Sequence, residues 1–564
     1  MEEKKYAGLE ALRAFKEEND KVYATQVSVE ELASEVVYIN ATDNETIVDP
    51  DVSVGDIVID SELSEASTNP VQNRVITQKI SRLSEVHVLE EGENIESIDD
   101  DVDVVYDPFS DSEGVLDIGQ LALSICVTPE MFGAKGDGIT DDTEAINSAL
   151  NCGGVISFST KTYLVDASIF LNVKSNSVVN LNWAIIKVIP NNLSRHYAFN
   201  VEGVENVAIQ NGIILGERDE HTGDEGEWGF GIRIQNSKNV SVRNVAIEDF
   251  WGDGICLGGA NKDIIIEKCQ ISNCRRQGIS ICGAENITVA NCYIANINGT
   301  DPQSCIDVEP NDGETAKNVL IIGNVFESPV STCMKSCQKK DGTRIIENLI
   351  ITKNTFIGTA EYAVYIIGHS AIVEGNIFHG VYNTDVLSFK RAEFCKVRNN
   401  YLSDCETGHV IYMENSPNIE IAGNTVSNTS CKYLLYNEGS SYLTLIANRI
   451  KEITALNSEV LIYLSSAADA NILKSIIKDN IMSNIMFHGI LRVSRYSTNT
   501  RFIDNIIEDS SSLTNIISQA SSLGCTVYAY GNFLPALDKP FVGVNNGDFS
   551  GVADNNYFDN ILTT

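Results

Sequence analysis

Proline, histidine and tryptophan are scarce in this 564-residue chain, which has 11, 7 and 3 of them beside 40 glycines. With a hydrophobic content of 43%, this composition excludes a collagen-like or disordered polymer and indicates a folded protein. No apolar run is long enough to cross a membrane, so we expect no membrane insertion. The N-terminus leads into a charged stretch at residues 9–18 rather than into the apolar core of a secretory signal.

Positive charge is also in short supply, because 40 Lys and Arg stand against 78 Asp and Glu, a formal net charge of -38. Such a chain repels phosphates, so we expect no nucleic acid partner. The acidic residues are expected to form a solvated exterior. Carboxylates are preferred ligands of Ca²⁺, so Ca²⁺ binding is possible, but no cofactor is required by the sequence.

Several catalytic motifs are missing, among them GxSxG, HExxH and a phosphate-binding loop, which removes support for serine hydrolase, zinc protease and nucleotide chemistry. The 14 cysteines contain no CxxC pair and do not predict a zinc site or a disulfide framework. Many lie within apolar strand patterns and are expected to be small buried side chains of a reduced protein: Cys256, Cys269, Cys282, Cys292 and Cys305.

A repeat is the strongest signal present, beginning at about residue 155. Short segments with alternating apolar residues recur, such as NVAIQNGII (206–214), NVLIIGNVF (318–326) and NIEIAGNTV (418–426). An asparagine marks the turn in each repeat, with several intervals of 22 to 24 residues: Asn211, Asn244, Asn291, Asn324, Asn354, Asn376, Asn400, Asn424, Asn448, Asn480, Asn505 and Asn532. We expect these asparagines to adopt the left-handed conformation and to bond the same amide one repeat away.

This pattern predicts an all-β protein, a right-handed parallel β-helix with three short strands per coil. A β-propeller is the competing fold, but its blades need about 40 residues and their own recurring motif. The expected divisions are an N-terminal region at 1–125, a cap at 126–155, the β-helix at 156–535 and a C-terminal cap at 536–564.

The predicted cap is the stretch PEMFGAKGDGITDDTEAINSAL at residues 129–150. Its glycines suit tight turns, and Thr140 or Asp141 is expected to cap a helix that carries Ala145, Ile146 and Leu150 on one face. A helix in this place would cover the open end of the first coil.

This cap motif, together with the coils up to about residue 535, resembles the pectate lyase-like superfamily, the polygalacturonase-related branch that includes many bacteriophage tailspikes. Two N-terminal segments, YAGLEAL (6–12) and LSEASTNPVQN (63–73), are similar to short stretches of phage tail fibres and spikes. The resemblance implies a homotrimeric virion protein, assembled in the host cytoplasm, whose N-terminal region attaches to tail or baseplate proteins. Its β-helix would act outside the cell on a bacterial surface polysaccharide.

The N-terminal region contains one weak oligomer signal. Ile76, Ile80 and Leu83 follow the spacing of a coiled-coil seam, although over fewer than three heptads. We expect this small α/β region to serve attachment and trimerisation.

Four successive coils share a strand of the form Gly-Ile-x-Ile, and its outward positions predict one column: Arg233, Cys256, Ser280 and Asp307. Glu309 shares a face with Asp307, and two carboxylates at i and i+2 lie about 6.5 to 7 Å apart at the backbone. That spacing is near the lower end of the separation in inverting glycosidases. Asp307 and Glu309 are therefore the expected acid/base pair, with Asp253 as a third carboxylate. An ordinary acidic surface is the alternative.

Arg233, Arg275 and Arg276 are expected to contact substrate or stabilise charge. The polar loop at 216–229 interrupts the coil beside the same face, and its Trp228 and His221 could wall a sugar groove, together with Trp251. A mobile loop is the alternative. Four further histidines have no evident partner and are expected at the surface or in turns: His369, His379, His409 and His488.

Three functions remain open. Hydrolysis of a glycan is preferred, because of the carboxylates. A lyase acting on a uronate-containing glycan would depend instead on Arg275, Arg276 or Lys335 and often on Ca²⁺. A receptor-binding spike without catalysis would use the same groove for adhesion alone.

Overall fold

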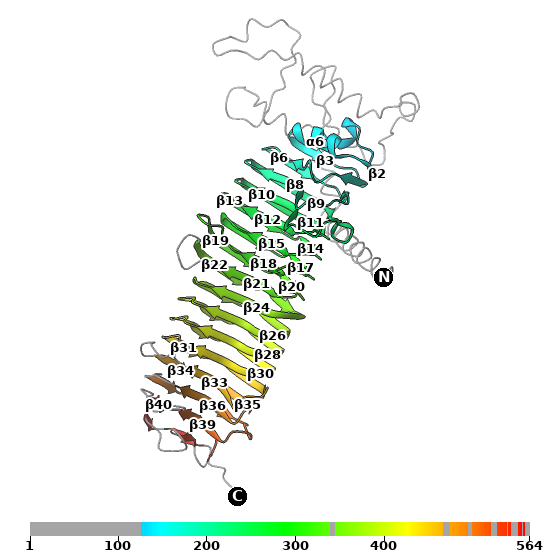
Figure 1. Cartoon of the computed structure of the whole chain (residues 1–564). Coiled ribbons are helices and arrows are strands. Elements are labelled where there is room, and N and C mark those ends of the chain that lie inside the picture. Colours follow the sequence, from blue (N-terminus) through cyan, green and yellow to red (C-terminus); the bar gives the residue numbers. More distant parts are fainter. Residues whose placement is uncertain are drawn as a thin grey trace, which may run out of the picture. The chain divides into compact units, whose positions relative to one another are not determined.

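The computed structural model describes residues 126–338, 345–465, 474–494, 499–519, 527–537, 540–542, 551–554 and 556–558. The chain divides into two compact units, Met1–Val105 and Tyr106–Thr564. The predicted attachment and trimerisation region at 1–125 lies outside the described residues. The described part of the second unit is a parallel β-solenoid of about 16 turns (Figure 1).

The cap consists of β1 (Cys126–Val127), the 3-10 helix η3 (Pro129–Phe132), β2 (Asp137–Asp141) and α6 (Thr143–Asn151). Ile146, Ala149 and Leu150 of α6 are buried, whereas Ala145 is partly buried against the same core. The N-cap is Asp142 rather than Thr140 or Asp141, and its carboxylate accepts the backbone N–H groups of the glycine loop, from Lys135 at 2.7 Å and Gly136 at 3.0 Å. The buried carboxylate therefore fixes the loop to the helix.

Each coil passes through three stacks of parallel strands, and long strands bend from one stack to the next. Stack A contains β8 (Arg195–Glu202), β10 (Trp228–Gln235), β12 (Asp253–Gly258), β15 (Gln277–Ile281), β18 (Ser304–Val308), β21 (Thr332–Cys337), β24 (Thr359–Ile367), the C-terminal parts of β26 (Ile377–Lys390), β28 (Tyr401–Glu414) and β30 (Thr425–Glu438), β33 (Val460–Ser465), β36 (Gly489–Ser494), β39 (Asn515–Gln519) and β42 (Phe541–Val542). The short β5 (Leu171–Asn172) pairs with β8.

Stack B contains β3 (Gly154–Ser157), β6 (Ser177–Asn180), the N-terminal parts of β9 (Glu205–Leu215) and β11 (Lys238–Glu248), β13 (Asn261–Glu267), β16 (Ala284–Ala290), β19 (Thr315–Ile322), β22 (Ile345–Thr352), β25 (Ala371–Glu374), β27 (Lys396–Arg398), β29 (Glu420–Ala422), β31 (Leu443–Ile446), β34 (Ser475–Lys478), β37 (Thr500–Ile503), β40 (Val527–Tyr530) and β43 (Gly551–Asp554).

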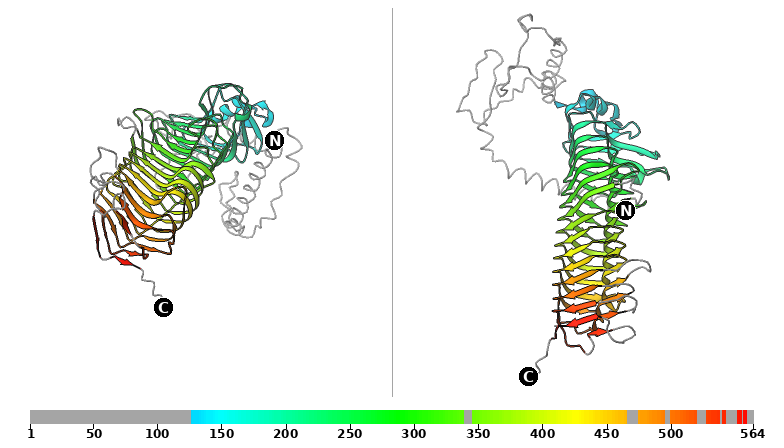
Figure 2. Two further views of the ribbon diagram at one scale, coloured as in Figure 1. Left: turned by 60° about the horizontal axis from the view of Figure 1, so that its bottom comes forward. Right: turned by 90° about the vertical axis from the view of Figure 1, so that its left-hand side faces the viewer.

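Stack C contains β2, β4 (Thr162–Val165), β7 (Ile185–Val188), the remaining parts of β9 and β11, β14 (Gln270–Ser272), β17 (Tyr293–Ala295), β20 (Val325–Glu327), β23 (Thr355–Ile357), the N-terminal parts of β26, β28 and β30, β32 (Arg449–Ala455), β35 (Ile481–Met486), β38 (Ile506–Glu508), β41 (Phe533–Leu534) and β44 (Tyr557–Phe558). Figure 2 shows the coils stacked in sequence order.

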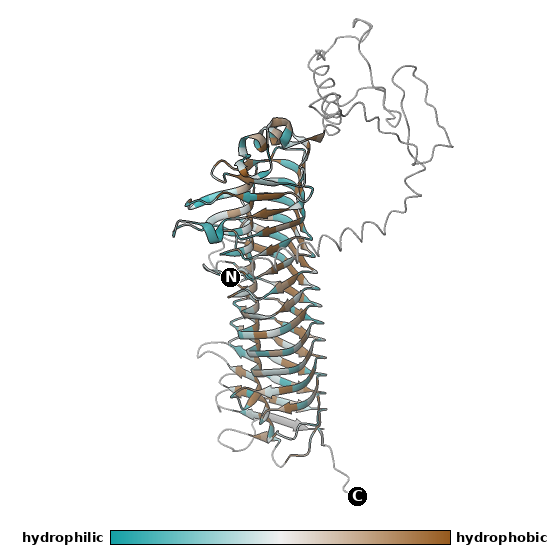
Figure 3. Ribbon diagram, turned by 90° about the vertical axis from the view of Figure 1, so that its right-hand side faces the viewer, coloured by the Kyte–Doolittle hydropathy of each residue, from teal (hydrophilic) through white to brown (hydrophobic). Residues whose placement is uncertain are grey.

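Apolar side chains at equivalent positions form continuous columns inside the solenoid. The column from stack A is buried throughout: Ile232, Ile255, Ile279, Ile306, Met334, Val364, Leu387, Ile411, Leu435, Ile462, Leu491 and Ile517. Full burial of one such side chain stabilises the fold by about 1.5 to 3 kcal/mol. Hydrophobic segments accordingly recur along the strands (Figure 3). The predicted repeat is thus confirmed in the described coils.

The predicted asparagine ladder is also confirmed, with one difference. Asn211, Asn244 and Asn291 adopt positive φ angles, but from Asn324 onward it is the preceding residue that does so, such as Gly423 before Asn424. The later asparagines point inward and are buried. In each, Nδ2 donates to the Oδ1 of the next, for example at 3.0 Å from Asn376 to Asn400. Burial costs an amide little when all its hydrogen bonds are made.

Replacing Asn400 with alanine is expected to lower the free energy of unfolding by about 2 kcal/mol, because neighbouring buried amides lose their partners. The Oδ1 of Asn400 accepts from both the backbone N–H and the Nδ2 of Asn376, and its own Nδ2 donates to Val373 and Asn424. Urea denaturation followed by circular dichroism measures the change. Lys396→Ala on the exposed face of the same coil is the control, and equal effects would contradict a structural role for the ladder.

Other features of the described residues bear on the earlier expectations. Parallel pairing continues through β42, β43 and β44, so described residues of the range 536–564 add to the stacks. The described cysteines are all free; Cys269, Cys292 and Cys305 are buried, whereas Cys256 and Cys282 are only partly buried, since Cys256 points outward. Within this part of the chain, no helix is sufficiently long and apolar to cross a membrane.

Candidate functional site

The predicted outward column forms in register on stack A. Arg233 pairs with Cys256, Cys256 with Ser280, and Ser280 with Asp307. The column then continues through Lys335 and Tyr365, which the Gly-Ile-x-Ile pattern did not include. Parallel strands in register stand about 4.8 Å apart, so side chains separated by more than twenty residues in sequence become direct neighbours.

Asp307 lies between Ser280 and Lys335 in this column and is buried, with 1% of its surface exposed. Its Oδ2 accepts hydrogen bonds from Gln277 Nε2 and from Lys335 Nζ, each at 3.2 Å. Its Oδ1 is buried without a hydrogen-bond partner. Burial raises the pKa of Asp307 to about 6, although the Lys335 ammonium opposes the shift. A carboxyl group in this state can hold a proton near neutral pH and release it, as a general acid must.

Asp253 lies on the same outer face and is fully buried. Its Oδ2 accepts a hydrogen bond of 2.7 Å from Ser280 and lies 3.3 Å from Nη1 of Arg276. Burial raises its pKa to about 6, partly offset by the Arg276 charge. Asp253 pairs with Gln277, and Gln277 donates to Asp307, so the two aspartates lie on one surface, two coils apart.

Glu309 is the more accessible acid, with 38% of its side chain exposed. Lys335 Nζ lies 3.2 Å from Asp307 Oδ2 and 3.9 Å from Glu309 Oε2, so these oxygens are at most about 7 Å apart. That limit includes the separations of both retaining and inverting glycosidases. We call Asp253, Asp307 and Glu309 the acid cluster. Lysine and arginine already neutralise its aspartates, an arrangement that does not favour Ca²⁺ between them.

Two of the three predicted arginine contacts are engaged in ion pairs. Arg276 joins Asp253 to the loop residue Glu227, with Nε 3.4 Å from the Glu227 carboxylate. Arg233 donates to Asn200 and Glu202, at 2.8 Å each, and lies three coils from Asp307. Arg276 is therefore placed in the acid cluster, whereas Arg233 is bound to carboxylate and amide groups elsewhere on the column.

The loop at 216–229 is fixed to the coils beneath it. Arg275 Nη1 donates to the carbonyl of Gly226 at 2.8 Å, and its guanidinium lies 3.8 Å from the ring centroid of Trp251. His221 stacks against Trp251 at 4.1 Å. Both Trp251 and Arg275 thus hold the loop, and the buried His221 side chain is not placed where a sugar could stack on it. Trp228, in contrast to Trp251 and His221, is open to solvent, with 48% of its surface exposed.

An aromatic surface that the sequence analysis missed continues stack A beyond the acid cluster. It consists of partly buried rings in one column, where Ser388 separates the first ring from the other three. We call it the tyrosine platform: Tyr365, Tyr412, Tyr436 and Tyr463. Tyr412 and Tyr436 stack at 5.8 Å, and Tyr436 and Tyr463 at 5.1 Å. Intervals of 24 and 27 residues between the last three tyrosines were the available signal.

Two further histidines differ from expectation. His409 lies beside the platform, where its Nδ1 is 2.7 Å from Asp385 Oδ1 and its ring stacks near Tyr433 at 5.7 Å. His369 is buried rather than at the surface, with Nε2 2.8 Å from the Ser336 hydroxyl. Burial lowers the pKa of His369 to about 4, so it stays neutral at physiological pH.

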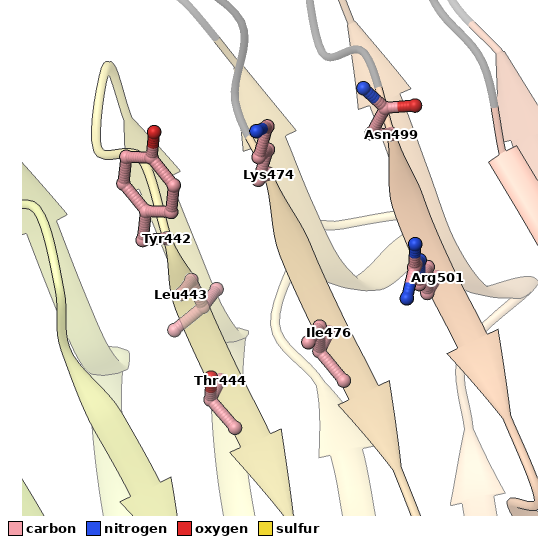
Figure 4. A pocket seen from close by; sticks show the side chains of 7 residues that line it. All are labelled: Tyr442, Leu443, Thr444, Lys474, Ile476, Asn499 and Arg501. Carbon is pink, nitrogen blue, oxygen red and sulfur yellow. The ribbon is translucent and has the colours of Figure 1, made fainter.

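A pocket of about 360 Å³ lies on stack B, near its C-terminal end (Figure 4). Its lining residues come from β31, β34, β37 and the adjoining turns: Tyr442, Leu443, Thr444, Lys474, Ile476, Asn499 and Arg501. Lys474 Nζ lies 5.6 Å from the Tyr442 ring centroid. This basic pocket belongs to a different stack from the acid cluster and contains no carboxylate.

Comparison with known proteins agrees with this architecture. The chain is 32% identical to YclG of Bacillus subtilis (strain 168) over 364 residues, which are 53% of this chain and 62% of that protein. It is 30% identical over 193 residues to Depolymerase 1, capsule KN3-specific, of Klebsiella phage KN3-1, covering 30% of this chain and 24% of the depolymerase. The chain therefore spans less than two thirds of either relative.

Among solved structures, the N-terminal fragment of gene product 12 of bacteriophage Phi29 has a similar fold, with a TM-score of 0.50 and 16% identity over 75% of this chain and 72% of that one. The family model described as "Right handed beta helix region" matches residues 166–350 and 341–507. Because the matched residues make up more than half of the sequence, the chain belongs to the right-handed β-helix family.

Proposed function

We propose that the outer face of stack A binds a bacterial surface polysaccharide and depolymerises it by glycosidic hydrolysis. The observation that carries this proposal is the acid cluster, in which a buried aspartate of raised pKa and a half-buried glutamate contact one lysine. Asp307 would donate a proton to the leaving oxygen, and Glu309 would act as the base or nucleophile. Asp253 would support the charge balance through Arg276. Similarity to a capsule-specific phage depolymerase supports the substrate class.

Hydrolysis is favoured over a lyase mechanism by the state of Lys335. Burial lowers the pKa of this lysine, but the carboxylates of Asp307 and Glu309 outweigh that effect and raise it. The ammonium therefore remains protonated at neutral pH and is a poor base for proton abstraction next to a uronate carboxylate. In the hydrolase, Lys335 would instead hold the two carboxyl groups in place, since its Nζ lies 3.2 Å from Asp307 Oδ2 and 3.9 Å from Glu309 Oε2.

The experiment is to incubate the full chain with a panel of capsular polysaccharides and lipopolysaccharides and to size the products by gel filtration. Hydrolysis yields shorter chains with new reducing ends and no unsaturated product. Shorter chains that absorb in the ultraviolet would identify a lyase, and binding without any change in chain length would identify an adhesion protein. Either of these two results would overturn the proposed reaction.

The tyrosine platform would hold the glycan beside the acid cluster, because aromatic faces pack against the apolar faces of sugar rings. Replacing Tyr436 with alanine is expected to weaken binding about tenfold, since the variant loses the ring between Tyr412 and Tyr463. Calorimetry in an Asp307→Asn background measures the affinity without cleavage. Tyr442→Ala, in the pocket on stack B, is the control. A larger loss of affinity in this variant would show that the glycan binds in that pocket instead.

We propose further that the protein is a homotrimeric virion appendage attached to tail proteins through residues 1–125. The similarity to a phage depolymerase supports this assignment, as does the coiled-coil spacing of Ile76, Ile80 and Leu83. Light scattering on the full chain tests the trimer. A monomer would contradict it.

A further inference from the structure

A second group of ionisable side chains lies beneath the loop at 216–229. His196 comes from β8, Glu217 follows β9, and His221 follows the 3-10 helix η4 (Arg218–Glu220). All three side chains are fully buried, and one ligand atom from each lies within 4.8 Å of the others. Two imidazoles and a carboxylate, one from β8 and two from the loop, thus converge at one buried point.

The hydrogen bonding of His196 defines which ring nitrogen carries a proton. Its Nδ1 lies 3.1 Å from the carbonyl oxygen of Leu193, and a carbonyl can only accept, so Nδ1–H is the donor. In the neutral ring, Nε2 then presents a lone pair to Glu217 Oε1 at 2.7 Å. Two lone pairs at this distance repel unless a cation joins them. A histidine that donates one N–H to a carbonyl while its other nitrogen faces outward is the usual arrangement of a metal ligand.

The same three side chains also carry polar atoms without a hydrogen-bond partner. His196 Nε2, Glu217 Oε2 and His221 Nε2 are buried and have no hydrogen-bond partner. Glu217 Oε1 also lies 3.0 Å from His221 Nδ1. A buried polar atom without a hydrogen-bond partner is unfavourable, so three on one cluster of side chains require a compensating interaction.

We propose that His196, Glu217 and His221 bind a divalent transition-metal ion, with Zn²⁺ as the first candidate. Imidazole nitrogens together with one carboxylate suit Zn²⁺ and its neighbours in the first transition row, whereas Ca²⁺ and Mg²⁺ prefer oxygen ligands alone. Three protein ligands leave a fourth position for water. This site is separate from the acid cluster and independent of the proposed hydrolysis.

The role of the ion would be structural. Glu217 and His221 bracket η4 at the start of the loop, and His196 belongs to the coil below, so a shared ion fastens the loop to the solenoid. Stacking of His221 on Trp251 orients the imidazole for that purpose. The same loop supplies Glu227, which contacts Arg276 of the acid cluster. Metal binding would therefore stabilise the wall of the candidate active site.

The test uses the full chain after removal of metal with a chelator. Calorimetric titration with Zn²⁺ should show one ion per chain, and added Zn²⁺ should raise the unfolding temperature. Co²⁺ in place of Zn²⁺ should give visible absorption bands without the near-ultraviolet charge-transfer band of cysteine ligation. Glu217→Gln, which preserves side-chain volume, should weaken Zn²⁺ binding at least tenfold. Asp219→Asn, an exposed acid in the same turn, should bind like the wild type.

A second variant tests the same site if Glu217→Gln does not fold. His221→Phe removes a ligand but retains an aromatic ring to stack on Trp251, and it should fold without gaining stability from Zn²⁺. Absence of any bound Zn²⁺ or Co²⁺ in the wild type would overturn the proposal. Unchanged binding by both variants, or a thiolate band with Co²⁺, would place the ion at another site and overturn it equally.

Discussion

Asp307→Asn is expected to reduce depolymerisation by about 10² to 10⁴-fold, the usual contribution of a general acid. Asparagine has the same shape but carries no transferable proton, so the leaving oxygen would depart unprotonated. Gln277 and Lys335, which contact Asp307, remain in place and still fill the column. The rate is measured as the loss of polysaccharide size per unit time, with circular dichroism to confirm that the β-structure is retained.

Glu414→Gln is a matched control for this experiment. Glu414 follows the column residue Tyr412 by two positions, as Glu309 follows Asp307, and its carboxylate lies 3.8 Å from Lys390. In the column, Tyr412 lies between Ser388 and Tyr436, so the position that corresponds to Asp307 holds no carboxylate. This variant should keep full activity. A fully active Asp307→Asn would remove Asp307 from the mechanism.

The second large effect is a pH-dependent gain of stability in the same variant. Burial raises the pKa of Asp307 from its usual 3.8 to about 6, so the folded state binds this proton more tightly than the unfolded state. The group therefore contributes stability that is fully present below about pH 3.8 and is lost as the pH rises through about 6. At 1.36 kcal/mol per pKa unit, the loss amounts to about 3 kcal/mol at neutral pH.

The asparagine side chain of the Asp307→Asn variant is neutral at every pH, so the two proteins should be equally stable near pH 3.5. Their free energies of unfolding should separate as the pH rises, until the variant is about 3 kcal/mol more stable above about pH 7. Urea denaturation at several pH values measures this difference, and other carboxylates cancel because both proteins contain them. A difference that does not change with pH would show that Asp307 titrates normally and would remove the basis for its role as an acid.

The solenoid and its register were predictable because one physical rule repeats in every coil. In the Gly-Ile-x-Ile strands the inward positions are apolar, so the residues between them must point outward. That rule alone was enough to align Arg233, Cys256, Ser280 and Asp307. The ladder of amides was predictable for a similar reason. Its backbone conformation was not, because the asparagine moves by one position relative to the turn. Asn291 and Gly323 occupy equivalent left-handed positions, and Asn324 follows that position, a shift that leaves the asparagine spacing almost unchanged.

The surroundings of Lys335, His221 and Trp251 could not be predicted, because they depend on contacts between coils of different composition. The rung after Asp307 reads Thr-Cys-Met-Lys and lacks the shared pattern, so the position of Lys335 over both acids was not evident. The burial of His221 depends on how an irregular loop folds over β8, which periodicity does not describe. Trp251 was expected to face sugar for the same reason, whereas His221 and Arg275 cover its ring.

A crystal structure of Asp307→Asn with an oligosaccharide of the cleaved glycan would show whether neighbouring coils of stack A form one glycan site. We expect a sugar chain along the tyrosine platform, with a glycosidic oxygen within hydrogen-bond reach of the substituted side chain at position 307 and Glu309 near the same linkage. An oligosaccharide bound instead in the pocket of Tyr442, Lys474 and Arg501 on stack B would contradict it.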